Sequence, residues 1–134
     1  MRRVYDFHGG IYPSERKSLS NREAIRKAGV PKQLVLPLSQ HIGPPAAVIV
    51  EPGQTVLGGQ RLTDLSSLPI HAPSSGVIAA IEDRPIPHAS GLTGRCIVID
   101  CDGEDRWVAL KPVADFRSLS PADLVQRLFE AGLA

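Results

Sequence analysis

The chain has 134 residues, which suits one domain, and its 43% hydrophobic content suits a globular protein with its own core. The formal net charge of +1 excludes a protein that attracts nucleic acid or anionic lipid through overall positive charge. No apolar run approaches the roughly 20 residues that a membrane-spanning helix needs, so direct membrane insertion of this chain is excluded as well.

The residue composition predicts a mainly β protein. Twelve glycines and twelve prolines are many for this length, and such residues separate short strands by frequent turns. Aromatic residues make up only 4% of the chain, so the core must consist of Val, Ile, Leu and Ala.

The first 32 residues are predicted to be irregular. Ser20 and Glu23 have the spacing of a capping box, which predicts one short helical turn that continues through Lys27. Residues 33–38 are apolar and extended, and the internal Pro37 is typical of an edge strand, because proline cannot donate a hydrogen bond to a neighbouring strand.

Seven further short strands follow in the prediction. They occupy residues 46–51, 55–56, 60–63, 70–73, 76–82, 95–101 and 106–110. Asp102 and Gly103 predict a hairpin turn between the last two, and Trp107 is expected in the core. Cys96 and Cys101 are too far apart along one strand for a disulfide, and Cys96 is expected to be a small core residue.

Three glycines are predicted to make structural turns. Pro52 fixes φ at the first turn position, and Gly53 then takes the positive φ of a type II turn. Gly59 supplies a second turn, and Gly76 is expected to do the same after residues 73–75. Ser74-Ser75-Gly76 does not join a strand to a helix, so a turn is favoured over a phosphate-binding loop there.

A helix is predicted at the carboxyl end of the chain. Ser120 is a suitable N-cap, Pro121 suits the first helical position and Gly132 suits the stop. The apolar residues at helical spacing are Leu124, Val125, Leu128 and Phe129.

Residues 50–62 and 70–78 together resemble the two halves of a biotinyl/lipoyl-type domain. The resemblance implies a barrel-sandwich hybrid, a flattened barrel of two interlocked hairpin units. Carrier domains of this kind attach their cofactor to a lysine at the tip between the halves. The corresponding residues 63–69 contain no lysine, and none occurs from residue 33 to residue 110. A carrier function is therefore disfavoured.

Four strings extend the resemblance over most of the chain: residues 7–11 (FHGGI), 36–43 (LPLSQHIG), 71–76 (HAPSSG) and 84–92 (RPIPHASGL). They resemble the N-terminal region of the RnfC family, whose members belong to the Rnf electron-transport complex. That complex is a bacterial, membrane-bound, ion-translocating ferredoxin:NAD oxidoreductase. The resemblance implies an N-terminal segment (1–32), a barrel domain (33–112) to which N-terminal segments are candidate additions, and a helix (113–134) that leads to a flavin- and NADH-binding domain.

The same resemblance implies where cofactors and partners lie. FMN and 4Fe–4S clusters are expected only in parts of the parent RnfC protein beyond this chain, whose two cysteines are too few for a cluster. The expected partners are the flavin/NADH domain, other Rnf subunits and, as a candidate, ferredoxin. The expected location is the cytoplasmic side of the bacterial inner membrane, reached through partner subunits.

The sequence predicts no catalytic, cofactor-binding or metal-binding residue in this chain, and a structural and docking role follows. The candidate docking loop is stiffened by two prolines, which lowers the entropy lost on binding, and it contains Arg84, Pro85, Pro87 and His88. The alternative is a stand-alone carrier-like, small-ligand or metal-binding module. Its candidate ligands are His8, His41, His71 and His88.

Overall fold

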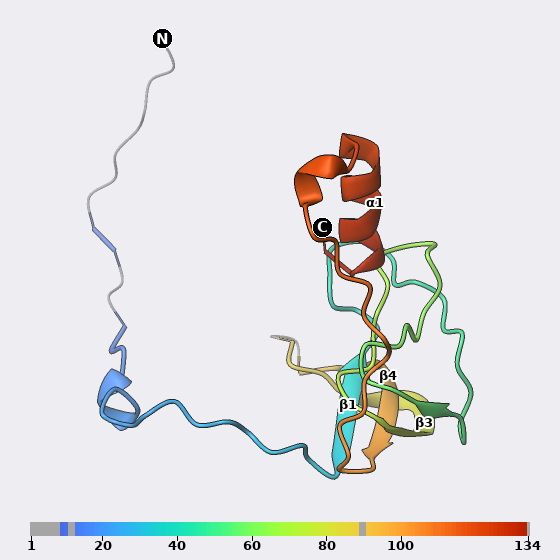
Figure 1. The fold of residues 1–134 in the computed structure, drawn as a ribbon. Helices are drawn as coiled ribbons and strands as arrows, with labels where there is room; N and C mark the ends of the chain where they lie inside the picture. Colours follow the sequence, from blue (N-terminus) through green and yellow to red (C-terminus); the bar gives the residue numbers. More distant parts are fainter. Residues whose placement is uncertain (1–8, 11–12, 89–90, 134) are drawn as a thin grey trace.

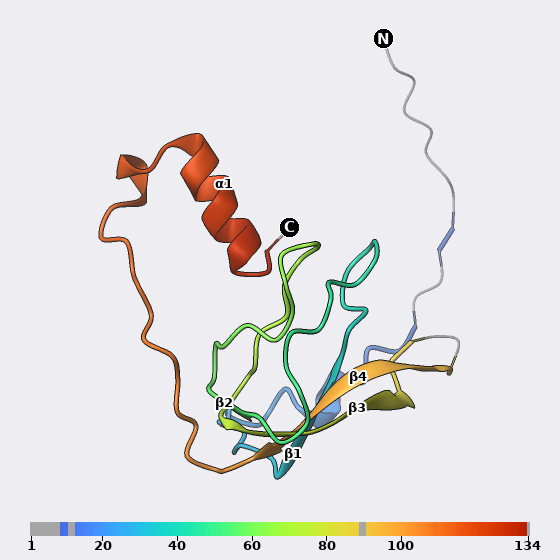
Figure 2. The same cartoon turned by 90° about the vertical axis from the view of Figure 1, so that its right-hand side faces the viewer.

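The computed structural model describes residues 9–10, 13–88 and 91–133 and shows a mainly β domain with one α-helix in that part of the chain. A curled antiparallel sheet has the strand order β1-β4-β3-β2 (Figures 1 and 2). Its strands are β1 (Gln33–Pro37), β2 (Thr55–Val56), β3 (Gly76–Pro85) and β4 (Thr93–Cys101).

Strand β4 lies at the centre of the fold. Residues 96–99 are all buried, although adjacent residues of a strand point to opposite faces. Protein therefore covers both faces of the sheet at this point, as in a sandwich. Cys96 is fully buried here, which confirms the prediction that it is a small core residue.

A second, irregular layer closes the barrel over the sheet. The segments around Val48, Thr63 and His71 meet through single β-bridges, and not through the regular strands that the sequence predicted at residues 46–51, 60–63 and 70–73. Individual backbone bonds hold this layer together, such as Leu62 N–H to the Ile70 carbonyl at 2.8 Å. Frequent Pro and Gly turns leave each segment too short for a continuous ladder.

The core lies between the sheet and this second layer. Its members are aliphatic, as the low aromatic content predicted. The buried cluster consists of Leu38, Val50, Val56, Leu62, Ile70, Ala72, Ile78, Ile97 and Ile99. The fold is thus the half-barrel of a barrel-sandwich hybrid, which confirms the predicted fold class.

Strand β1 lies at the edge of the sheet, as the sequence predicted. Its register with β4 is bounded by two backbone bonds, Cys101 N–H to Lys32 O and Leu38 N–H to Arg95 O, both 2.9 Å. Alternation along the strand then turns the nitrogen of Pro37 away from β4. The missing N–H therefore falls on the open edge, where it costs no ladder bond.

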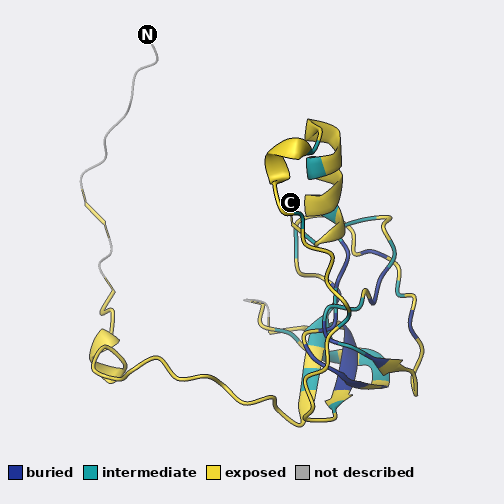
Figure 3. Ribbon diagram, viewed as in Figure 1, coloured by how far each residue is buried: buried dark blue, intermediate teal, exposed yellow. Residues whose placement is uncertain are grey.

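Residues 13–32 run away from the barrel, and all of them are exposed (Figure 3). The predicted helical turn from Ser20 to Lys27 is wrong. A short 3₁₀ helix, η1 (Lys17–Leu19), ends at Ser20 instead, and Glu23 forms an ion pair with Arg26 at 2.6 Å. No apolar face of this segment is buried, so nothing stabilises a longer helix.

The predicted hairpin at Asp102-Gly103 is also wrong. The chain leaves the sheet after β4, and Trp107 forms a single parallel bridge with Gly58. The indole is 52% exposed, so the expected core position is wrong as well. The ring lies on the backbone of Gly58, where an added Cβ would come within 2.8 Å of it. That platform comes from a segment almost fifty residues earlier and draws the chain away from β4.

The carboxyl end forms the predicted helix. After a 3₁₀ helix, η2 (Phe116–Ser118), helix α1 (Pro121–Glu130) begins at Ser120, whose hydroxyl accepts a bond from Asp123 N–H at 3.1 Å. Helix α1 stands above the barrel, with its carboxyl end directed towards it (Figure 2). Within the described residues, no helix is long and apolar enough to cross a membrane.

Candidate functional site

The tip between the two half-barrels, residues 63–69, is closed by its own side chains. Thr63 is fully buried, and its hydroxyl accepts a hydrogen bond from Ile70 N–H at 2.9 Å. The Asp64 carboxylate accepts bonds from the hydroxyl of Ser66 at 2.6 Å and from Ala47 N–H at 3.1 Å. The pKa of Asp64 is lowered, and the hydrogen bonds from Ser66 contribute most to this shift. A carrier domain has an amine at this tip, whereas this chain has a carboxylate bound within its own turn.

Two of the three predicted turn glycines adopt the expected conformation. Gly53 has φ +88°, and Gln54 N–H donates to Glu51 O at 3.1 Å, as in a type II turn. Gly59 has φ +74° in a turn closed by Gln60 N–H to Leu57 O at 3.0 Å.

The predicted positive φ of Gly76 is wrong, because Gly76 is an ordinary strand residue at the start of β3. Its lack of a side chain matters for a different reason. A Cβ at this position would overlap the backbone carbonyl of Asp100 on the neighbouring strand β4. Gly76 therefore permits close approach of two strands and does not shape a turn.

The two serines before Gly76 hold the sheet to the segment that leaves it. The hydroxyl of Ser74 donates to Asp105 Oδ1 at 2.8 Å, and that of Ser75 donates to Asp102 Oδ1 at 2.7 Å. Ser75 Oγ also accepts from Arg106 N–H at 2.9 Å. We call these five residues the serine latch. Its hydroxyls are used within the fold, which supports the prediction that this loop is not a phosphate site.

Asp102 is the electrostatic centre of the serine latch. Arg106 donates to its Oδ2 at 2.6 Å, and Glu104 N–H donates to Oδ1 at 2.9 Å. These bonds, with that from Ser75, favour the charged form and lower the pKa of Asp102 to about 2, the Arg106 bond contributing most. The carboxylate is ionised at neutral pH and its hydrogen-bonding capacity is largely used.

The environments of the two cysteines lower the reactivity of their thiols. Cys96 is buried and donates to the Gly94 carbonyl at 3.2 Å. Burial, together with the negative charges of Asp102, Asp100 and Asp105, raises the pKa of the Cys101 thiol. A raised pKa reduces the thiolate fraction, and the thiolate is the reactive form.

The prediction that Arg84 and Pro85 lie in a docking loop is wrong, because they are the last two residues of β3 and pair with Gly94 and Thr93. The connection from β3 to β4, which contains Pro87 and His88, borders a groove of about 470 Å³. Pro87 and His88 face the end of β1 across this groove, and Leu36 and Pro37 form part of the opposite wall. The Arg84 guanidinium is bound to Glu82 on its own strand at 2.6 Å. The structure thus brings the loop and the sheet edge together, which the sequence did not predict.

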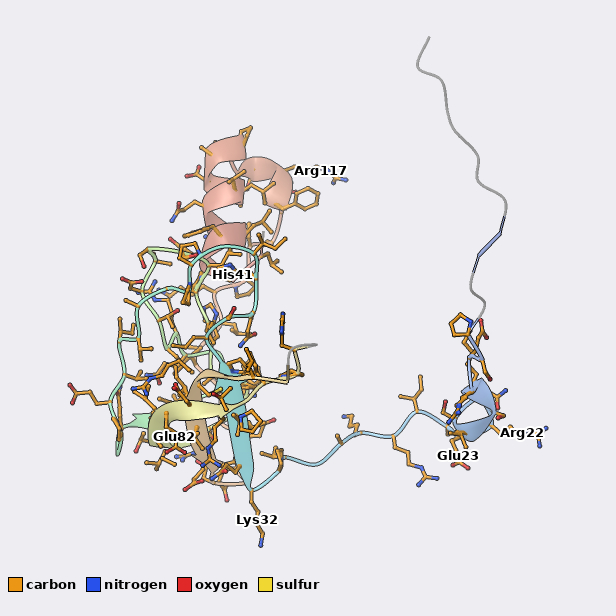
Figure 4. All side chains as sticks on the ribbon, turned by 180° about the vertical axis from the view of Figure 1, so that it is seen from behind. Arg22, Glu23, Lys32, His41, Glu82 and Arg117 are labelled. Atoms are coloured by element: carbon orange, nitrogen blue, oxygen red, sulfur yellow. The ribbon has the colours of Figure 1, made fainter. Side chains whose placement is uncertain are left out.

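Two of the four candidate metal ligands line the same pocket. His41 and His71 line one small polar pocket together with Ala131 and Gly132 at the end of α1. Figure 4 shows His41 on the side of the barrel below α1. Burial, followed by the charge of Arg61, lowers the pKa of His71, so that its imidazole is neutral at pH 7. His88 lies at the other groove, and His8 falls outside the described residues.

No described cluster contains three or more His, Cys, Asp or Glu side chains placed to hold one metal ion. The Ser74–Asp105 and Ser75–Asp102 pairs were missed by sequence reasoning, because about thirty residues separate their partners. The local signal was limited to adjacent serines and a cluster of acidic residues.

Comparison with known proteins agrees with this geometry. The model of the RnfC barrel sandwich hybrid domain family matches residues 5–104. The chain belongs to this family. The C subunit of the ion-translocating oxidoreductase complex of Vibrio cholerae strain O395 is 47% identical over 98% of the chain, and that of Serratia proteamaculans is 46% identical over the same share. The chain spans only 18% and 19% of the length of these two relatives. The RnfC resemblance predicted from the sequence is therefore confirmed, and the chain corresponds to the N-terminal domain of such a protein.

Proposed function

We propose that this RnfC-type domain is a non-catalytic structural and docking domain within the RnfC protein of an ion-translocating oxidoreductase complex. The main support is that several of its polar and thiol groups are engaged or buried within the fold. The Asp64 carboxylate closes the tip, Ser75 and Asp102 bind one another in the serine latch, and Cys96 is buried. What the domain offers to other molecules is a stable shape with a loop-bordered groove.

The proposal extends to cofactors, partners and place. FMN, the 4Fe–4S clusters and electron transfer between ferredoxin and NAD belong to parts of the RnfC protein outside this chain. The domain positions the flavin/NADH domain and contacts other subunits of the complex, with ferredoxin as a candidate partner. It lies on the cytoplasmic side of the bacterial inner membrane, held there by those partners.

Absorbance spectra test the division of cofactors. We expect flavin and iron–sulfur bands from the full-length RnfC protein after reconstitution, and none from the 134-residue chain treated in the same way. Stoichiometric flavin or iron–sulfur cluster on the 134-residue chain would contradict the proposal.

Substitution in and beside the loop tests docking. Arg84→Ala with His88→Ala, placed in the full-length RnfC protein, is expected to reduce its recovery in the assembled complex several-fold while its cofactor content stays unchanged. Arg95→Ala is the matched control, because this exposed arginine lies on the partner strand and makes only a 3.8 Å ion pair with Asp83. Equal assembly of the loop variant and the control would refute a docking role for this loop.

One observation favours the metal-binding alternative. The Nε2 atom of His41 is buried without a hydrogen-bond partner, in the pocket that it shares with His71. Zinc titration of the 134-residue chain tests this alternative. One tightly bound zinc ion, lost in both His41→Ala and His71→Ala, would support it; equal weak binding by all three proteins would exclude it.

A further inference from the structure

Helix α1 has an apolar face that the described part of the chain covers only in part. No residue of the helix is buried, and its side chains are largely exposed (Figure 3). Val125 is 65% exposed and Leu128 is 44% exposed. Leu124 and Phe129 lie on the same side of the helix, because residues three and four positions apart share a face, and these two are partly buried.

The opposite side of α1 is polar. Gln126 donates to Glu130 at 2.8 Å, and Asp123 and Arg127 lie on the same half of the helix. The helix is therefore strongly two-sided, which is the pattern of a helix that packs one side against other protein. A helix of ten residues is marginal in water without such packing.

The position of α1 is defined at one end. Gly132 has φ +79°, and an added Cβ would come within 2.8 Å of the Pro69 carbonyl on the barrel. Leu133 N–H donates to Leu128 O at 3.0 Å, so the last turn closes regularly before the chain continues. The carboxyl end of the helix thus lies against the barrel, while Val125 and Leu128 remain exposed, as does Leu133 just beyond the helix at 58%.

The relatives show how much further polypeptide is available to cover this face. This chain matches 17–22% of the length of the RnfC proteins to which it is similar, so about four-fifths of such a protein lies outside it. A segment that continues from residue 134 starts at the carboxyl end of α1. Its tethering gives it a high effective concentration at the apolar face, an advantage that a separate partner lacks.

We propose that in the full-length RnfC protein the apolar face of α1 packs against the part of the same polypeptide that follows residue 134. This inference rests on the proposed function and names the surface through which the barrel positions the rest of the protein. The same contact fixes the orientation of the barrel, because α1 lies against Pro69 at one end and packs on the following polypeptide along its face.

Hydrogen–deuterium exchange tests the inference. We expect the amides of α1 to exchange at least about tenfold more slowly in the full-length RnfC protein than in the 134-residue chain. In the full-length protein, Val125→Asp with Leu128→Asp is expected to restore fast exchange. Gln126→Asp is the matched control, since it adds a charge to the neighbouring position on the polar side, and it is expected to retain slow exchange.

Other outcomes would overturn the inference. Equal exchange of α1 in the two wild-type proteins would leave the face uncovered by the rest of the polypeptide. Protection of the 134-residue chain that grows with its concentration would assign the face to a second copy. Protection that appears only in the assembled complex would assign it to another subunit. Amides of β4 report whether the barrel of each variant is folded. Cofactor content and assembly, which test the proposed function, are measured separately on the same proteins.

Discussion

The serine latch and helix α1 differ in whether their side chains find partners within this domain. In the latch, the buried Ser75 hydroxyl both donates and accepts, and Asp102 binds three partners. In α1, the polar groups bond one another on an exposed side while Val125 and Leu128 face outward. The comparison separates a region that stabilises this domain from one whose stabilising partner lies elsewhere. Substitutions in the first should therefore affect the isolated chain strongly, and those in the second should affect it little.

The largest effect is expected at the strand that begins beside the latch. Gly76→Ala places a Cβ against the Asp100 carbonyl, so β3 and β4 must separate, and we expect a loss of about 3 kcal/mol in the free energy of unfolding. Urea denaturation of the 134-residue chain measures it.

Gly53→Ala is the control for that substitution. Gly53 has φ +88° but no atom within 4 Å of an added Cβ, so the expected loss is only about 1 kcal/mol. Equal losses in the two variants would show that close approach of the strands is not what position 76 requires.

A smaller effect is expected within the latch itself. Ser75→Ala removes the partner of Arg106 N–H and one partner of Asp102, and should cost about 2 kcal/mol. Ser66→Ala, at an exposed position of the tip, removes the hydroxyl bond to Asp64, which water can replace, while the backbone N–H of residue 66 still donates to Asp64; it should cost less than about 1 kcal/mol. Urea denaturation of both variants checks the ranking; the reverse order would contradict the role of the latch.

The latch also predicts a dependence on pH. The pKa of Asp102 falls from its ordinary 3.8 to about 2 in the folded protein, so the unfolded chain binds more protons between these values. The stabilising contribution is complete above pH 3.8 and is lost as the pH falls through about 2. Asp102→Asn should flatten this part of the profile, measured as the urea midpoint at a series of acidic pH values. An unchanged slope would remove Asp102 as its source.

The smallest effect is expected on α1. In the 134-residue chain Val125→Asp should change the free energy of unfolding by no more than about 0.5 kcal/mol, because the side chain is 65% exposed there. Thermal denaturation measures it. A loss above about 2 kcal/mol would show that the apolar face already stabilises the isolated chain, and that α1 does not differ from the latch in this respect.

Much of the fold was predicted from local patterns. Pro37 indicated an edge strand, because a residue without an N–H is tolerated where one side of the strand has no neighbour. Pro52-Gly53 indicated a type II turn, because the φ values of such a turn are set within four residues. Ser120 and Pro121 indicated the start of α1 for the same reason. The absence of lysine from residues 33–110 argued against a carrier without any knowledge of the fold.

The wrong predictions share a physical cause. A short helix from Ser20 and a hairpin at Asp102-Gly103 both have good local signals, but no packing against the rest of the domain stabilises either one. Trp107 was expected in the core, and the distant backbone of Gly58 instead provides a platform for it at the surface. In each case a contact, or its absence, far along the chain outweighed a preference of a few residues.

The amino-acid sequence alone determined the caps of α1, the edge position of β1 and the membership of the RnfC family, because each depends on adjacent residues or on strings of unusual residues. Only the tertiary structure decided why position 76 must be glycine and which serine binds which carboxylate. It also decided that Val125 and Leu128 on the apolar side of α1 are left exposed. These features depend on distances between residues far apart in the chain, and such distances are set only when the barrel closes over its core.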